Sequence, residues 1–196
     1  MKQEKALLIV DVQNDFCPGG ALAVPEGDRI ISVLNKYIKI FLRKKLPIFV
    51  SRDWHPKETK HFKQFGGPWP KHCIQNTRGA RFHPDLELPK GIIILSKGMD
   101  PDKDSYSAFQ AVDSNGTEFF KLLKTLGVNE TFVGGLATDY CVKSSVLDAL
   151  KFGFKVKLLI DAIKGVNIKP KDSEEAIEEM VSRGAEKMTF EKLPFS

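Results

Sequence analysis

Cys141 is the residue in this sequence best placed for covalent chemistry. It lies in the run V-G-G-L-A-T-D-Y-C-V, where an apolar strand-like segment turns through two glycines into a helical pattern. The unpaired N–H groups and the dipole at the start of a helix favour an anion, which predicts a lowered pKa for the Cys141 thiol. Cysteine is also a common small core residue, so Cys141 alone does not decide between nucleophile and packing.

Other ionisable residues follow apolar runs in the same way. Asp11 closes L-L-I-V-D, Asp53 and His55 lie in F-V-S-R-D-W-H-P, and Lys97 lies in I-I-L-S-K-G. Taken singly, Asp11 suits a turn or a helix cap, and Lys97 suits a solvated surface. However, the carboxyl ends of parallel strands meet at one sheet edge, where packing alone would not gather ionisable groups. We expect Asp11 to take the Cys141 proton and Lys97 to favour the thiolate, which is a site for acyl transfer.

Asp53 and His55 also suggest a metal site. They are two residues apart, so their side chains point the same way on an extended segment and can share one cation. The candidates for a third ligand are His61, His72 and His83. We favour His72, in W-P-K-H-C on a long loop, and expect a solvated surface position for the other two histidines. Three N/O ligands leave positions open, as in catalytic metal sites, and suit zinc first, with iron or manganese as alternatives; neighbouring Cys73 remains open as a softer ligand.

Short apolar runs alternate with helical patterns along the chain, which predicts an α/β fold with a doubly wound, mostly parallel six-stranded sheet and helices on both faces. The expected strands are Ala6-Val10, Pro47-Ser51, Gly91-Leu95, Thr131-Gly134, Lys155-Ile160 and Lys187-Phe190. The expected helices are Asp28-Lys45, Gly116-Leu126, Asp139-Phe152 and Ser173-Arg183. We expect one domain over residues 1–196, with a loop insertion around 53–90 that carries the metal site.

Composition excludes several classes of protein. The chain has 196 residues, 42% of them hydrophobic and 28% charged, and a net charge of +5. The lysines alternate with apolar residues at helical spacing, which indicates solvated helix faces and no nucleic-acid surface. No apolar run reaches the roughly 18 residues of a membrane span. Three widely spaced cysteines argue for reduced thiols and predict a cytoplasmic location.

The motifs together resemble a known family. The set L-I-V-D-V-Q-N-D-F, S-R-D-W-H-P, W-P-K-H-C, L-S-K-G and G-L-A-T-D-Y-C-V is similar to the nicotinamidases of the isochorismatase-like cysteine hydrolases, in the same order over nearly the whole chain. The resemblance implies hydrolysis of nicotinamide to nicotinate and ammonia in pyridine-nucleotide salvage, and commonly of pyrazinamide too. It implies a small-molecule substrate, and it leaves open whether the chain is a monomer or a homo-oligomer.

The resemblance also implies roles for individual residues. The triad falls on Asp11, Lys97 and Cys141, and the metal ligands fall on Asp53, His55 and His72. The aromatic residues that would sandwich a pyridine ring are Phe16, Trp69 and Tyr106. A cis peptide is implied between Leu136 and Ala137, with the amides of Ala137 and Cys141 forming an oxyanion hole.

Two other functions compete with nicotinamide hydrolysis. Another isochorismatase-like hydrolase, acting on isochorismate or on a ureido or carbamoyl amide, would typically lack the metal ligands. A non-catalytic metal- or ligand-binding protein with Cys141 as a redox-sensitive thiol is the second. Competent residues at every triad position disfavour the non-catalytic interpretation.

Overall fold

A six-stranded sheet forms the centre of the computed structural model, which describes residues 4–194; the ends of the predicted domain, 1–3 and 195–196, lie outside the described residues. Every strand pair is parallel, in the order β3-β2-β1-β4-β5-β6. The strands are β1 (Lys5–Val10), β2 (Ile48–Asp53), β3 (Ile93–Lys97), β4 (Glu130–Leu136), β5 (Lys155–Lys164) and β6 (Glu186–Met188). The strand order reverses between β1 and β4, so the predicted doubly wound sheet is confirmed.

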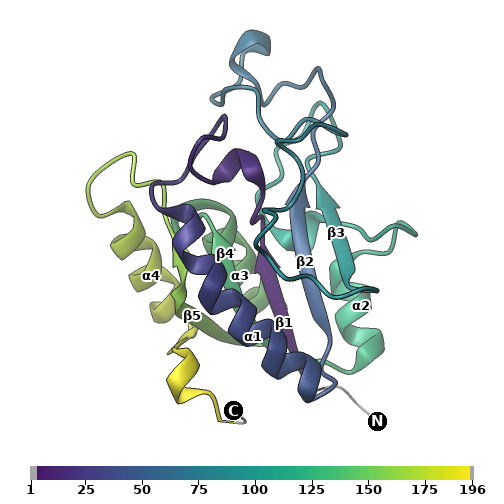
Figure 1. Ribbon diagram of the computed structural model, residues 1–196, viewed down its shortest axis with the longest axis vertical. Coiled ribbons are helices and arrows are strands. Elements are labelled where there is room, and N and C mark those ends of the chain that lie inside the picture. Colours follow the sequence, from purple (N-terminus) through teal and green to yellow (C-terminus); the bar gives the residue numbers. More distant parts are fainter. Residues whose placement is uncertain (1–3, 195–196) are drawn as a thin grey trace.

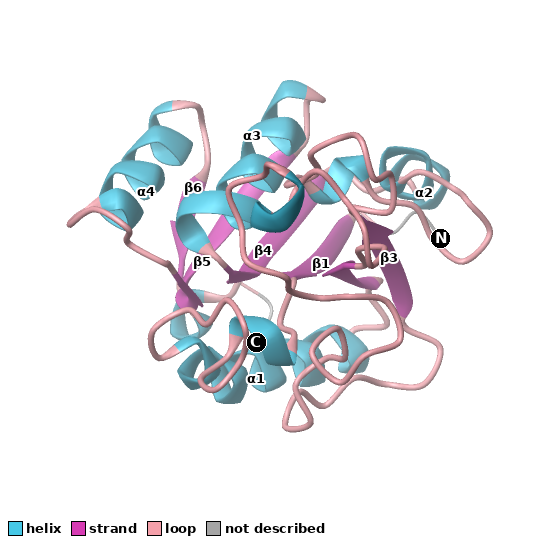
Figure 2. Cartoon of the chain, turned by 90° about the horizontal axis from the view of Figure 1, so that it is seen from above, coloured by secondary structure: helices cyan, strands magenta, loops and turns pink. Residues whose placement is uncertain are grey.

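Helices cover both faces of the sheet, as predicted. They are α1 (Ile31–Arg43), α2 (Phe119–Leu126), α3 (Lys143–Lys151) and α4 (Asp172–Ser182). Seen from above, α1 lies on one side of the sheet and α2, α3 and α4 lie on the other (Figure 2). A 3₁₀ turn at Gly27–Ile30 leads into α1, and a π-helical turn at Thr138–Val142 leads into α3.

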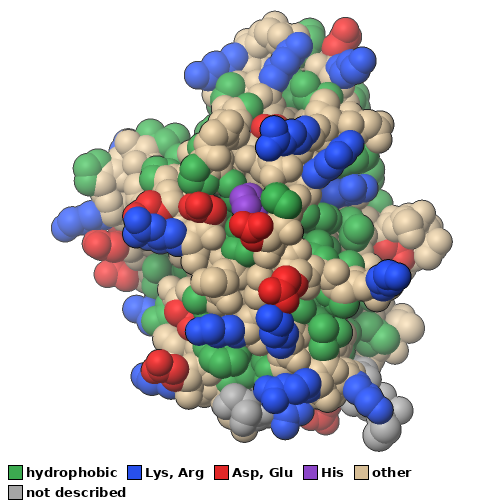
Figure 3. Space-filling model, in the orientation of Figure 1, with side chains coloured by type: hydrophobic (Ala, Val, Ile, Leu, Met, Phe, Trp, Pro, Cys, Tyr) green, Lys and Arg blue, Asp and Glu red, His purple; other side chains and the backbone are tan. Residues whose placement is uncertain are grey.

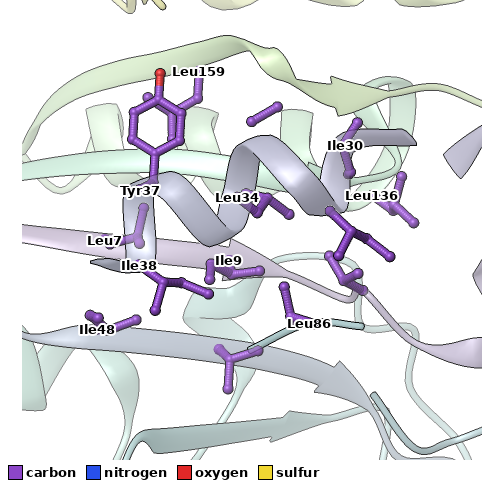
Figure 4. Packing of buried hydrophobic residues seen from close by; sticks show 14 of the residues in the cluster. Leu7, Ile9, Ile30, Leu34, Tyr37, Ile38, Ile48, Leu86, Leu136 and Leu159 are labelled. Atoms are coloured by element: carbon purple, nitrogen blue, oxygen red, sulfur yellow. The ribbon is translucent and has the colours of Figure 1, made fainter. Parts of the chain in front are cut away.

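The strands are buried on both faces, which explains their apolar runs without polar alternation. In β1, Leu7 and Ile9 pack in the core beneath α1, whereas Leu8 and Val10 pack in the core beneath α2 and α3. Figure 4 shows the first of these cores, where Leu34 of α1 lies over the sheet. Alternate residues of one strand therefore hold two helix layers, and the strand ends are fixed between them.

Strands β2 and β3 extend two residues beyond their predicted ends. Their last residues pair in register, so Asp53 lies directly opposite Lys97. Both residues are therefore part of the sheet ladder and do not belong to the loops that follow. The prediction from apolar runs missed these positions because the ladder continues through polar residues.

Gly135 allows close approach of the two central strands where the order reverses. Its φ is 125°, and a Cβ atom there would lie 2.1 Å from the carbonyl oxygen of Val10. The register between β4 and β5 also shifts between Val133 and Gly135. Only glycine fits this position without moving the backbone.

The long segments after β2 and β3 rise above the carboxyl edge of the sheet, at the top of Figure 1. Basic and acidic side chains are interspersed on the face drawn in Figure 3, as expected for solvated surfaces. Within residues 4–194, no helix is long and apolar enough to cross a membrane.

Candidate active site

The carboxyl edge of the sheet brings the predicted triad together. The ammonium of Lys97 lies 2.9 Å from Asp11 Oδ2 and 3.4 Å from Cys141 Sγ, and it also donates to Asp53 Oδ1. All four residues are buried, with Asp11 and Lys97 at 0% and 1% exposure. These residues come from four neighbouring strand ends, at the point where the strand order reverses. The arrangement places a carboxylate, an ammonium and a thiol in mutual contact.

A hydrogen bond from Ser51 fixes the carboxylate of Asp11. The Ser51 hydroxyl on β2 donates to Asp11 Oδ1 at 2.7 Å, and the Asp11 backbone adopts a positive φ of 49° directly after β1. Burial raises the pKa of Asp11, although the Lys97 ammonium opposes this shift. A carboxyl group with a raised pKa is well suited to accept a proton and hold it. In the sequence, Ser51 is an ordinary strand residue and gives no signal of this contact.

Lys97 is charged in spite of its burial. Burial lowers its pKa, but the carboxylates of Asp11 and Asp53 outweigh that cost and hold the Lys97 pKa well above its usual value. Burial likewise raises the pKa of Asp53, whereas Lys97, His55 and His72 together hold it well below the usual value. Lys97, Asp11 and Asp53 form a buried ion cluster in which each charge depends on the others.

The prediction of a lowered pKa for Cys141 is wrong. Burial raises the pKa of the thiol well above its usual value, and the nearby carboxylates of Asp11 and Asp53 add to this, while Lys97 opposes it. One ammonium does not offset the burial of the thiol beside two carboxylates. Cys141 therefore rests as a thiol, and a nucleophilic attack needs a base to take its proton.

Asp53, His55 and His72 have the spacing of metal ligands. Asp53 Oδ2 lies 3.6 Å from His55 Nε2 and 3.7 Å from His72 Nε2, and the ligand atoms all lie within 4.8 Å of one another. The other ring nitrogens contact carbonyl oxygens, since His55 Nδ1 donates to Gly98 and His72 Nδ1 donates to Pro70. These bonds leave both Nε2 atoms facing the carboxylate, since a hydrogen bond at the other ring nitrogen is what orients metal-binding histidines. The three side chains therefore fit a divalent cation.

Gly98 is part of this metal site through its backbone. A Cβ atom at this position would lie 2.5 Å from His55 Cε1, and the φ of Gly98 is 69°. The histidine ring thus packs directly against the chain as it leaves β3. Any side chain here would displace the ring and disturb the ligand set.

His61 corrects another expectation, because it is buried and not on a solvated surface. Its ring lies 5.0 Å from that of His55, its Nδ1 is 2.7 Å from Asp104 Oδ1, and its Nε2 contacts the Lys103 carbonyl. These contacts tie the segment after β2 to the segment after β3. His83 is partly exposed and lies beside Asp85, outside the ligand groups found among the described residues.

Cys73 is buried, and its backbone N–H donates to Asp15 Oδ2 at 2.7 Å. In the part of the chain that the structure describes, it belongs to no cluster with metal-ligand spacing. Burial raises the pKa of its thiol well above the usual value. Cys73 therefore supports the loop next to His72 through its backbone.

Four aromatic residues line the cavity together with Cys141, and we define Phe16, Trp69, Tyr106 and Tyr140 as the aromatic wall. Trp69 Nε1 donates to the Tyr106 hydroxyl at 2.9 Å, and the Trp69 and Tyr140 rings meet edge to face at 5.1 Å. The predicted aromatic residues thus all line the cavity. Tyr140 was not among the predicted aromatic residues, although its position directly before Cys141 was a usable signal.

The cavity itself measures about 530 Å³, including the space open to solvent. Apart from the site groups already described, its lining is mostly apolar and includes Leu22, Val24, Leu136 and Val166. Small-molecule sites are commonly of this kind, with a few polar groups in an apolar pocket. The cavity therefore suits a small, flat, uncharged ligand whose reactive group faces Cys141.

Asp139 lies in the turn Thr138–Val142, which also carries Tyr140 and Cys141. Its carboxylate accepts the backbone N–H groups of Val166 and Asn167, at 3.0 and 2.7 Å. The peptide between Leu136 and Ala137 is cis, as expected. The two hydrogen bonds of Asp139 join the turn that carries Cys141 to the loop after β5.

Known proteins that resemble this chain show the family to which it belongs. A profile of the isochorismatase domain matches residues 5–192, so the chain belongs to the isochorismatase family. It is 43% identical over 200 residues to the nicotinamidase of Escherichia coli K12, covering 92% of each chain. It is also 37% identical over 166 residues to the nicotinamidase/pyrazinamidase of Mycobacterium tuberculosis, covering 83% of this chain and 88% of that one.

A solved structure of a similar protein also resembles this chain in fold. The pyrazinamidase of Pyrococcus horikoshii, solved in complex with zinc, has a TM-score of 0.88 and 50% sequence identity, covering 95% of this chain and 99% of that one. The family and fold predicted from the sequence are therefore confirmed. That relative was solved with zinc, and Asp53, His55 and His72 of this chain form a group with metal-ligand spacing.

Proposed function

We propose that this chain hydrolyses nicotinamide to nicotinate and ammonia, and that it also accepts pyrazinamide. The observation that carries the proposal is the meeting of Cys141 with the Asp53, His55 and His72 group in one mostly apolar cavity. Proteins that share 43% and 37% of their residues with this chain are named nicotinamidase and nicotinamidase/pyrazinamidase. The substrate class is thus a small heteroaromatic amide.

In the proposed reaction, Cys141 Sγ attacks the carboxamide carbon while Asp11 accepts the thiol proton. The new S–C bond forms as the C=O electron pair moves onto oxygen, giving a tetrahedral intermediate. Lys97 stays charged and balances the two carboxylates beside the sulfur. The raised pKa of the Cys141 thiol makes this proton transfer a requirement of the attack.

The intermediate collapses when the C–N bond breaks and Asp11 returns the proton to nitrogen, which leaves as ammonia. The backbone amides of Ala137 and Cys141 are the proposed donors to the oxyanion, next to the cis peptide. Water then attacks the thioester carbon and gives its proton to Asp11, and the acid departs as the thiol re-forms. Each proton in both halves of the cycle passes through one carboxylate.

Asp53, His55 and His72 are the proposed ligands of a divalent metal, with zinc first. Such a cation supplies a Lewis acid that can bind a ring nitrogen of the substrate and orient the ring. Phe16, Trp69 and Tyr106 are proposed to contact the two sides of that ring, together with Tyr140. The three cysteines are free thiols, which supports a reducing compartment, and we propose the cytoplasm.

The test is an assay of ammonia from nicotinamide, run together with elemental analysis of the purified protein. We expect turnover of nicotinamide and pyrazinamide and about one divalent metal per chain. Alkylation of one thiol by iodoacetamide should abolish turnover. Metal-replete protein that releases no ammonia from any amide would instead favour a binding protein with a redox-sensitive Cys141.

A further inference from the structure

Lys97 lies at the centre of three groups that are themselves metal ligands. Asp11, Asp53 and Cys141 form a cluster whose ligand atoms all lie within 4.8 Å of one another. The Lys97 ammonium contacts one atom of each, at 2.9 Å from Asp11 Oδ2 and 3.4 Å from Cys141 Sγ, with Asp53 Oδ1 as the closest partner. An ammonium group thus occupies the position that a cation on these ligands would take.

The cluster needs a cation at this position. Asp11 is 0% exposed, and its Oδ2 accepts no hydrogen bond among the described residues. The ion pair with Lys97 therefore offsets the cost of burying the negative charge of Asp11. Asp53 Oδ1 is likewise paired with Lys97. Removing one partner of a buried ion cluster leaves charges that water does not reach. Without the ammonium, these carboxylates would hold another cation or lose their charge.

Asp53 connects this cluster to the proposed metal site. Its Oδ1 pairs with Lys97, whereas its Oδ2 lies 3.6 and 3.7 Å from the Nε2 atoms of His55 and His72. A carboxylate that contacts two neighbouring cations is typical of a binuclear metal centre, in which the ions lie about 3.5–4 Å apart. Here the second cation is the side chain of a lysine.

We propose that Lys97 occupies a second cation site and so keeps a second metal ion off Cys141. Removal of the ammonium opens a site made by Asp11, Asp53 and Cys141 for a thiophilic divalent cation. On binding there, the metal–sulfur bond forms as the Cys141 thiol proton is released to solvent. The sulfur electron pair is then held by the metal, and the thiol no longer attacks an amide.

Lys97→Ala tests this proposal through metal content, with cobalt(II) as the probe. The wild-type protein should bind one equivalent at Asp53, His55 and His72, without a thiolate-to-cobalt charge-transfer band, even in excess cobalt. Lys97→Ala should bind two equivalents and show that band. Lys97→Ala/Cys141→Ser should lose the band, and added methylammonium should compete with the second cobalt ion in Lys97→Ala. Lys97→Arg, which keeps a positive charge at this position, is the matched control and should bind one equivalent.

Two results with soluble protein would overturn the proposal. One is folded Lys97→Ala that binds a single cobalt ion without the band, and the other is a thiolate band in the wild-type protein. If Lys97→Ala is insoluble without metal, recovery of the folded chain with two equivalents supports the proposal. Insolubility with and without metal contradicts it, because a bound cation would replace the ammonium. No substrate is involved, so failure here leaves the ammonia assay of the proposed function unaffected.

Discussion

The ion cluster at the sheet edge and the aromatic wall face the same cavity, but they are held in different ways. Asp53 and Lys97 are paired residues of adjacent strands, and Asp11 directly follows a third strand. Trp69 and Tyr106, by contrast, lie on irregular segments, where a side-chain hydrogen bond of 2.9 Å joins the two residues and contacts such as that of His61 with Asp104 join the segments. The first group is positioned by the backbone ladder and the second by contacts between loops.

This difference separates two kinds of effect. A change in the ion cluster alters groups that form or break bonds, so it should reduce kcat. A change in the wall alters the fit of the ring, so it should raise KM and leave kcat nearly constant. Mutations can therefore be chosen to affect one region and spare the other.

Cys141→Ala should give the largest effect, because it removes the proposed nucleophile. We expect ammonia release from nicotinamide to fall by about 10⁴-fold or more, with nicotinamide binding retained. Activity assays and calorimetric titration measure the two quantities. Cys17→Ala, at a buried cysteine of the core beneath α1, is the control and should remain active. Turnover by Cys141→Ala close to that of the wild type would refute covalent catalysis at this residue.

His72→Ala should have the next largest effect, because it removes a proposed metal ligand. We expect substoichiometric metal and a KM raised by at least about tenfold. Elemental analysis and steady-state kinetics provide the measurements. His83→Ala should keep full metal content, since that ring lies by Asp85. Full metal content and unchanged KM in His72→Ala would exclude this histidine as the third ligand.

Tyr106→Phe should affect the wall alone. It removes the acceptor of the Trp69 indole N–H and keeps the ring. Leaving a partly buried donor unpaired costs about 1–2 kcal/mol, which corresponds to KM raised by about 5–30-fold if the wall loosens. We expect kcat to stay within about twofold. A fall in kcat with constant KM would mean that the wall and the ion cluster are not independent.

Tyr37→Phe is the matched substitution outside the cavity and should have the smallest effect on catalysis. The Tyr37 hydroxyl donates to Asp161 Oδ1 at 3.0 Å, so its loss should lower the free energy of unfolding by about 1–2 kcal/mol. Burial and then Asp161 raise the pKa of Tyr37 well above its usual value. Above about pH 10 the unfolded chain loses this proton while the folded chain keeps it, so the wild-type advantage shrinks.

Urea denaturation of wild type and Tyr37→Phe at pH 7 and pH 10.5 measures this difference. Steady-state kinetics at pH 7 should give unchanged KM and kcat for the variant. An advantage that grows with pH would contradict a proton held more tightly in the folded state.

The sequence predicted the sheet and its edge because apolar runs mark the strands, and the carboxyl ends of parallel strands meet. It placed the ends of β2 and β3 two residues short, since Asp53 and Lys97 continue the ladder as polar residues. His61 was misjudged because its partner Asp104 is distant in sequence and comes close only in the fold. The pKa of Cys141 was misjudged for a similar reason, as burial next to two carboxylates is not visible in a local motif.

The strand order has a consequence for variation among related proteins. The segments that supply Trp69 and Tyr106 follow β2 and β3, which form one side of the sheet, whereas Cys141 follows β4 beyond β1. Insertions or deletions in those two segments can reshape the pocket without shifting the strand ladder that holds the reacting groups. The fold therefore keeps the reacting groups fixed, while the part of the ligand-recognition surface on these two loops can vary with loop length.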